Sequence, residues 1–275
     1  MAQREDLQLP KSAMHIFKTK PSSLALLRMQ FHDCFVHGCD ASILLDGPDT
    51  EKTTKPNLNV RGYELIDDIK REIERTCPGV VTCADNHCHG YKDAVHGRAP
   101  YKFRCRNRKR GSYEPHASEV IDLPPSTATA SDSIQAFRRR VSTVTDRVDL
   151  LVRYRYMLGH CYHMPTASEH TFRDTKNLVT EGSLPVYQPQ DARYSLNCGQ
   201  LIHKQVLYWQ NGILKVDQDI AFNEASRSIV GEVARDTYQE FNVNFGEAMV
   251  NLQRVGVLPY QEGQVRQSCR VPVQI

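Results

Sequence analysis

The 275-residue sequence contains no apolar run approaching the roughly 18 to 20 residues that a membrane-spanning helix needs. It also lacks a large charge of either sign, because 35 lysines and arginines stand against 32 aspartates and glutamates. These absences exclude a membrane span and a chain-wide polycation that would bind nucleic acids or membrane surfaces. With 40% hydrophobic residues, the chain can fold as one large domain or two small ones.

The amino terminus, MAQREDLQLPKSAMHIF, has no apolar core, so no secretory signal is visible. No Asn-x-Ser/Thr acceptor for N-glycosylation is present either, although this does not disprove secretion. Cysteine, in contrast, is plentiful. Nine cysteines are a high and odd count, which in a disulfide-bearing protein leaves at least one thiol without a partner in the chain.

The spacing of apolar residues predicts helices at Leu24 to His32, Gly62 to Thr76 and Phe245 to Val255. In the second of these, one face carries Leu65, Ile66, Ile69 and Ile73. Alternating strand patterns do not persist, no internal repeat is evident, and segments with proline and glycine separate the helices. The sequence therefore predicts a mainly α-helical fold, with a boundary between two helical halves near residues 125–130.

Arg28, Phe31 and His32 have the spacing i, i+3 and i+4, so on a helix they project from one face. A cation, a flat apolar ring and an imidazole on one face can bind and polarise a small molecule. The alternative is a surface arginine beside a core phenylalanine and histidine. The residues that follow favour the functional interpretation.

The segment FHDCFVHGCDASILLD places Asp33, Asp40 and Ser42 around a glycine-containing turn between Cys34 and Cys39. Several hard oxygen ligands on a turn that a disulfide can close are typical of a Ca²⁺ site. Cysteine and histidine in the same window also allow a zinc site. Oxygen ligands outnumber the soft ones, which favours calcium.

The segments LLRMQFHDCFVHGCDASILLD, EKTTKPNLNVRGYELIDDIK and CPGVVTCAD resemble the distal half of class III (secretory plant) haem peroxidases. The resemblance covers residues 24–85 and resumes at Leu123 to Phe137 and Phe245 to Val271. It implies a mainly α, two-lobed helical fold with haem b between the halves. The distal half would cover residues 1–128 and the proximal half residues 129–275, together forming one structural domain.

The resemblance also implies roles for four residues of the distal half. His32 would be the base that takes a proton from hydrogen peroxide and returns it to the leaving oxygen. Arg28 would stabilise the charge that develops on that oxygen, and Phe31 would shield the haem edge. Asn57 would accept the other ring N–H of His32 and fix its tautomer.

For calcium, the resemblance implies a distal site with Glu51 linked to the ion through water. Its ligands would be the side chains or carbonyls of Asp33, Val36, Gly38, Asp40 and Ser42. The chain is too short between Cys198 and Gly212 for a second, proximal calcium site to be placed. The implied disulfides are Cys34–Cys39 and Cys83–Cys269, and Cys77 lacks its expected partner.

The proximal half resembles the family less closely, since RYRYMLGHCYHMPTASEH stands where the axial-histidine motif is expected. His160 is favoured as the axial haem ligand because Gly159 precedes it, and His163 is the alternative. Asp217, in Val-Asp-Gln, would accept the N–H of the axial imidazole. Pro124 corresponds to a proline that lines the aromatic-substrate channel, although a helix-breaking loop proline explains it equally well.

These features together predict a haem peroxidase that reduces hydrogen peroxide to water while oxidising phenolic or similar aromatic donors by one-electron steps. The alternative is a catalytically impaired peroxidase-fold protein that binds calcium or glycans. The basic run KFRCRNRKR contains a single aromatic residue and belongs to no recognised nucleic-acid-binding fold, so no nucleic-acid partner is expected. The resemblance and the cysteine content imply a monomer that is secreted, either extracellular or vacuolar.

Overall fold

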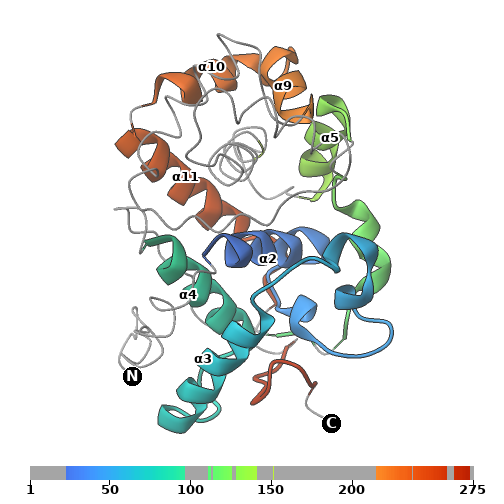
Figure 1. Ribbon diagram of the computed structural model, residues 1–275, viewed down its shortest axis with the longest axis vertical. Helices are drawn as coiled ribbons and strands as arrows, with labels where there is room; N and C mark the ends of the chain where they lie inside the picture. The colour runs from blue at the N-terminus through green and yellow to red at the C-terminus, as the bar shows by residue number, and fades with distance from the viewer. Residues whose placement is uncertain are drawn as a thin grey trace, which may run out of the picture. The chain divides into compact units, whose positions relative to one another are not determined.

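The computed structural model describes residues 23–96, 111–112, 114–125, 128–140, 151, 215–236, 238–258 and 263–272 (Figure 1). This part of the chain is mainly helical, as predicted, and its one β pairing is an antiparallel bridge between Gly111 and Gln264. The α-helices are α2 (Ser23–Val36), α3 (Tyr63–Thr76), α4 (Cys83–His96), α5 (Ala130–Arg140), α9 (Lys215–Phe222), α10 (Arg227–Arg235) and α11 (Tyr238–Leu252). Four 3₁₀ turns accompany them: η1 (Ser42–Leu44), η2 (Glu51–Thr53), η3 (Lys55–Asn57) and η4 (Ala117–Asp122).

The chain divides into two compact units. The first comprises Met1–Gly97, Lys102–Leu123 and Val250–Ile275, and the second comprises Arg98–Tyr101 and Pro124–Met249. The predicted grouping of residues 1–128 and 129–275 as halves of one structural domain stays a prediction. None of the described helices is both long and apolar enough to cross a membrane.

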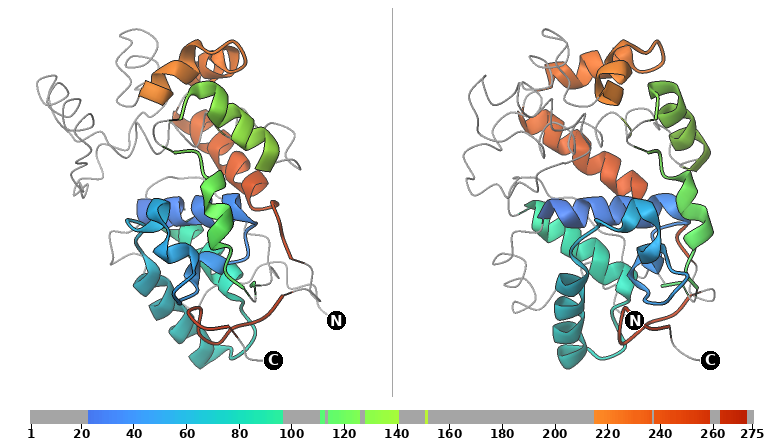
Figure 2. Two further views of the ribbon diagram at one scale, coloured as in Figure 1. Left: turned by 90° about the vertical axis from the view of Figure 1, so that its right-hand side faces the viewer. Right: turned by 45° about the vertical axis from the view of Figure 1, so that its right-hand side comes forward.

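In the first unit, α4 packs against both α2 and α3 (Figure 2). α3 buries the four residues that its periodicity predicts, namely Leu65, Ile66, Ile69 and Ile73. Gly62, just before α3, has a φ of 110°, and a Cβ there would lie 2.9 Å from Leu26 Cδ2 of α2. Glycine is therefore required where the start of α3 meets α2.

α2 continues beyond the predicted end at His32 to Val36. The added turn stays helical because Asp33, Cys34 and Phe35 are all buried and packed. This extension places the Arg28–His32 face and the start of the Asp33–Asp40 loop on one rigid element.

The carboxyl-terminal segment is joined to the first unit by several contacts. Gly111 and Gln264 exchange backbone hydrogen bonds of 3.0 and 2.9 Å. The N–H of Cys39 donates to the carbonyl of Val255 over 3.2 Å, and a Cβ on Gly38 would lie 2.3 Å from the oxygen of Gly256. The backbones of Gly38 and Gly256 are thus in direct contact, and the space between them leaves no room for a side chain.

Two disulfides that the resemblance implies are present, Cys34–Cys39 and Cys83–Cys269, and Cys77 is an exposed free thiol. Cys83–Cys269 links positions 186 residues apart, so it constrains the unfolded chain strongly. We expect replacement of both cysteines by alanine to lower the free energy of unfolding by about 2–5 kcal/mol, measured by urea denaturation.

Cys77→Ser is the matched control for that variant, because it removes a thiol at an exposed position with no covalent link. Its free energy of unfolding should stay within about 0.5 kcal/mol of the unaltered protein. If the double alanine variant unfolded at the same urea concentration as the control, the disulfide would not have the stabilising role assigned to it.

In the second unit, α9 packs against α5 and α10. α5 begins with a reciprocal cap: the N–H of Asp132 donates to Thr129 Oγ1 over 3.1 Å, and Thr129 Oγ1 donates to the Asp132 carboxylate over 2.7 Å. α11 covers Tyr238–Leu252, so it begins earlier than the predicted Phe245 and ends before the predicted Val255. The polar residues Asn242 and Asn244 interrupt the apolar spacing over its first turns.

Candidate active site

The predicted cation and imidazole meet on one face of α2. Arg28 Nε donates a hydrogen bond of 3.2 Å to His32 Nε2, one helical turn along. Phe31 is 5% exposed, and its ring lies 4.9 Å from that of Phe35, centroid to centroid. The phenylalanine is therefore fixed by packing, while Arg28 and His32 remain half-buried and reachable.

A chain of hydrogen bonds sets the tautomer of His32. Asn57 Nδ2 donates to the backbone carbonyl of Glu51 over 3.0 Å, which orients the amide with its oxygen toward the histidine. Asn57 Oδ1 lies 2.6 Å from His32 Nδ1. Because Oδ1 can only accept, the ring proton is on Nδ1, and Nε2 keeps its lone pair.

The pKa of His32 is lowered from 6.5 to about 4. Burial is the main cause and the positive charge of Arg28 adds to it, while the hydrogen bond to Asn57 acts in the opposite direction. The imidazole is therefore neutral at neutral pH. The Nε2 lone pair of the neutral ring, to which Arg28 Nε donates in this structure, can take up a proton when that hydrogen bond opens.

Arg28 is itself held by the loop that carries Asn57. Its Nη2 donates to Asn59 Oδ1 over 2.7 Å and to the carbonyl of Pro56 over 3.2 Å. The sequence analysis missed Asn59, although it lies in the KPNLN segment that carries the resemblance. The same loop thus positions both the arginine and the histidine.

The residues predicted to bind calcium lie together beneath this loop. Asp33, Asp40, Ser42 and Glu51 are all buried. Asp33 accepts the backbone N–H groups of Ala41 and Ile43 over 3.1 and 3.4 Å, which shapes the turn around it.

Three buried oxygen atoms in this cluster have no hydrogen-bond partner in the described part of the structure: Asp40 Oδ2, Ser42 Oγ and Glu51 Oε2. Asp40 Oδ2 does lie at ion-pair distance, 3.5 Å, from His116 Nε2. Burial and the charges of Asp33 and Asp40 raise the pKa of Glu51 to about 8. Burial also raises the pKa of Asp33. Unpartnered hard oxygens and mutually repelling carboxylates are what a bound Ca²⁺ would satisfy, so this cluster fits the ion.

The two backbone ligands of the prediction lie at the end of α2 and just after it. Val36 is the last residue of the helix. The carbonyl of Gly38 accepts the N–H of Asp40 over 2.8 Å, and a carbonyl oxygen keeps a second lone pair for a metal.

Arg266, from the carboxyl-terminal segment, is a second residue that the sequence analysis missed. It is fully buried and its Nη2 donates to the carbonyl of Ala41 over 2.7 Å. Burial lowers the pKa of Arg266 to about 10, and the charges of Asp40 and Asp33 oppose that shift. The arginine thus partly balances the carboxylates. Only its position inside the matched carboxyl-terminal segment could have indicated it.

The residues predicted for the proximal half are not part of the site described above. His160 and His163 lie outside the described residues. Asp217 lies in α9, but its side chain is also outside them. Pro124 is half-buried at the start of the second unit.

Comparison with known proteins decides the family. A family model described as "Peroxidase" matches residues 11–236. The chain belongs to the class III plant haem peroxidase family. It is accordingly a haem-dependent peroxidase, and the distal residues described above are chemically suited to that activity.

Several plant peroxidases are similar to this peroxidase over most of their length. "Peroxidase 60" of Arabidopsis thaliana is 33% identical over 277 residues, covering 91% of this chain and 81% of that protein. "Peroxidase 47" of Arabidopsis thaliana is 34% identical, covering 89% and 78%. "Peroxidase 66" of Zea mays is 31% identical, covering 89% and 79%.

Proposed function

We propose that this peroxidase reduces hydrogen peroxide to water and oxidises phenolic or similar aromatic donors by one-electron steps. The observation that carries the proposal is the His32 ring, held neutral with its proton on Nδ1 and its Nε2 beside Arg28. Each turnover would consume one hydrogen peroxide and two donor molecules, and yield two waters and two donor radicals. Haem b supplies the redox chemistry when bound.

His32 acts as the proton carrier in this proposal. Its Nε2 accepts the proton from one oxygen of hydrogen peroxide and returns it to the other oxygen, which leaves as water. The 2.6 Å contact with Asn57 stabilises the Nδ1 proton throughout, so the ring takes up charge without rotating.

Arg28 acts beside His32 as the electrostatic group. Its guanidinium is fixed by Asn59 and Pro56, and its Nε points at the nitrogen that exchanges the proton. It would stabilise the negative charge on the departing oxygen as the O–O bond breaks. Phe31, buried by packing against Phe35, would limit access so that donors react by electron transfer.

Calcium is proposed to support this arrangement from beneath. The ligands are Asp33, Val36, Gly38, Asp40 and Ser42, with Glu51 linked through water. Support comes from the unpartnered buried oxygens of Asp40, Ser42 and Glu51.

On the proximal side, we propose His160 as the axial ligand, with His163 as the alternative, and Asp217 as the partner of its N–H group. Pro124 is proposed to line the access route for aromatic donors. The protein is proposed to act as a monomer outside the cell or in the vacuole.

The experiment that tests the proposal is reconstitution with hemin. We expect a Soret band and hydrogen peroxide-dependent oxidation of guaiacol, a small phenol. His160→Gln and His163→Gln, made separately, should differ, and the change that alters or abolishes the Soret band identifies the axial ligand. If the chain could not bind hemin at all, the proposed reaction would fail, and a calcium- or glycan-binding role would remain as the alternative.

A further inference from the structure

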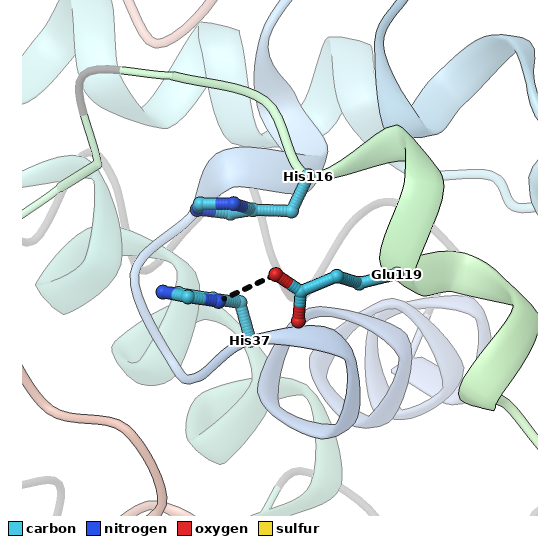
Figure 3. Close-up of side chains that lie close together, drawn as sticks. All are labelled: His37, His116 and Glu119. Atoms are coloured by element: carbon cyan, nitrogen blue, oxygen red, sulfur yellow. Dashed lines mark hydrogen bonds and ion pairs between the residues drawn. The ribbon is translucent and has the colours of Figure 1, made fainter.

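Two histidine rings and a carboxylate lie together in the first unit, outside the groups assigned to haem and calcium (Figure 3). The rings of His37 and His116 are stacked, with centroids 3.8 Å apart and planes 14° from parallel. His37 Nδ1 lies 3.1 Å from Glu119 Oε1. One possible ligand atom from each residue lies within 4.8 Å of the other two.

We propose that His37, His116 and Glu119 bind a divalent first-row transition-metal ion such as Zn²⁺, with water completing the coordination. Two imidazoles and a carboxylate are ligands that Zn²⁺ and Cu²⁺ prefer, whereas Ca²⁺ prefers a shell of oxygens. In a tetrahedral Zn²⁺ site with metal–ligand bonds of about 2.0–2.1 Å, two ligand atoms lie about 3.4 Å from each other. His37 Nδ1 and Glu119 Oε1, which share a hydrogen bond in this structure, lie 3.1 Å apart, close to that separation, so the ion would take the place of the shared proton.

His116 is already oriented as a metal-binding histidine is. Its Nε2 lies 3.5 Å from Asp40 Oδ2 and 3.3 Å from Ser112 Oγ. The hydrogen bond to the Ser112 hydroxyl and the nearby charge of Asp40 orient the ring and raise the basicity of its other nitrogen. A metal would therefore bind His116 through Nδ1.

Coordination requires a change in the stacked arrangement of the two rings. Because the two rings are nearly parallel, their nitrogen lone pairs do not point at a common position. One ring must turn before both can bind the same ion. The side chain of His37 is 41% exposed and that of Glu119 is 32% exposed, so both have room to turn and an ion reaches them from solvent. His37 follows α2 and the other two residues belong to the region of η4, so binding would tie these two segments together.

The test is a titration of the full-length, calcium-saturated protein with Zn²⁺, by calorimetry, after removal of any histidine tag. We expect one equivalent to bind. His37→Gln, His116→Gln and Glu119→Gln should each weaken binding at least about tenfold, because each removes a ligand. Glu224→Gln, which changes another exposed glutamate, is the matched control and should bind as the unaltered protein does.

Two further measurements separate this site from other zinc-binding groups. X-ray absorption at the zinc edge should show nitrogen and oxygen ligands at about 2.0–2.1 Å and no sulfur at about 2.3 Å. Cys77→Ser should leave the affinity unchanged, since the exposed thiol of Cys77 is not part of the site. Calcium content, measured in the same samples, should not fall as zinc binds.

Unchanged affinity in the double variant His37→Gln/His116→Gln would overturn the proposal, as would the absence of zinc binding by the unaltered protein. Loss of binding in Cys77→Ser, or release of calcium as zinc binds, would also overturn it, because the ion would then occupy another site. Circular dichroism of each variant checks that the fold is retained, and Glu119→Gln, at a partly exposed position, is the least disruptive of the three.

Discussion

His32→Ala is expected to slow the reaction of the hemin-loaded protein with hydrogen peroxide by about 10²- to 10⁴-fold while the Soret band is retained. The variant removes the imidazole whose proton is held on Nδ1 and whose Nε2 carries the lone pair, the atom to which Arg28 donates. Arg28 cannot replace it, because a guanidinium stays protonated and accepts no proton. Stopped-flow absorbance after mixing with peroxide measures the rate.

The pH dependence of that rate tests the role of His32 more specifically. The pKa of His32 is lowered to about 4, so the ring is neutral above that pH and takes up a proton below it. A base that is already protonated accepts no further proton, so the rate should fall as the pH drops through about 4. His32→Ala should lose this dependence along with the rate.

Two controls make the result interpretable. Asn57→Ala leaves His32 in place but removes the acceptor for its Nδ1 proton, so a smaller loss of rate is expected than in His32→Ala. Asp49→Asn changes an exposed loop residue and should react as the unaltered protein does. Near-normal peroxide reactivity in His32→Ala would show that another group carries the proton.

Removal of calcium is expected to destabilise the protein strongly. An ion present at about 1,000 times its dissociation constant stabilises the folded state by about 4 kcal/mol, and a chelator removes that contribution. In its absence, the buried carboxylates of Asp33, Asp40 and Glu51 face one another with Arg266 as the nearby buried cation. Thermal unfolding with and without chelator measures the loss as a lower Tm.

Calcium loss should also slow the reaction with hydrogen peroxide, because the two sites share a residue. Glu51 faces the calcium cluster with its side chain, while its carbonyl accepts the amide of Asn57 that orients His32. A shift of Glu51 would therefore misplace the Nδ1 acceptor. Added Ca²⁺ should restore both Tm and rate, whereas Mg²⁺ should not, since it requires shorter and more regular coordination.

Asp40→Asn provides the matched variant for the chelation experiment. It keeps the size of the side chain and removes one charge from the cluster, so it should weaken calcium binding in the folded protein. Its Tm without calcium should be no lower than that of the chelated, unaltered protein, because like-charge repulsion has been relieved. An unchanged Tm on chelation of the unaltered protein would contradict the calcium assignment.

Local pattern predicted α2, α3 and part of α11, and it placed the motif residues of α2 close together. The four apolar residues of α3 recur at helical spacing, and all four are buried, because a surface helix can bury only one face. Arg28 and His32 are four residues apart, so a helix alone brings them together. Asp33, Asp40 and Ser42 likewise lie within one short stretch of chain, and their grouping could be predicted from it.

Other residues of these sites make contacts across long sequence separations, which local patterns cannot predict. Arg266 lies 225 residues from the Ala41 carbonyl it contacts, and Glu119 lies 82 residues from His37. His116 meets both Asp40 and His37 only because η4 folds back beside the turn that follows α2. The zinc proposal could therefore not have been made from the spacing of these residues.

The sequence by itself determined the helical class and the family, and it predicted the distal residues, because these depend on periodicity and on a long contiguous motif. Only the tertiary structure decided the tautomer and low pKa of His32, the unpartnered oxygens of the proposed calcium site, and the meeting of His37, His116 and Glu119. Hydrogen-bond direction, burial and charge balance arise from groups far apart in the chain, and chain folding alone brings those groups into contact.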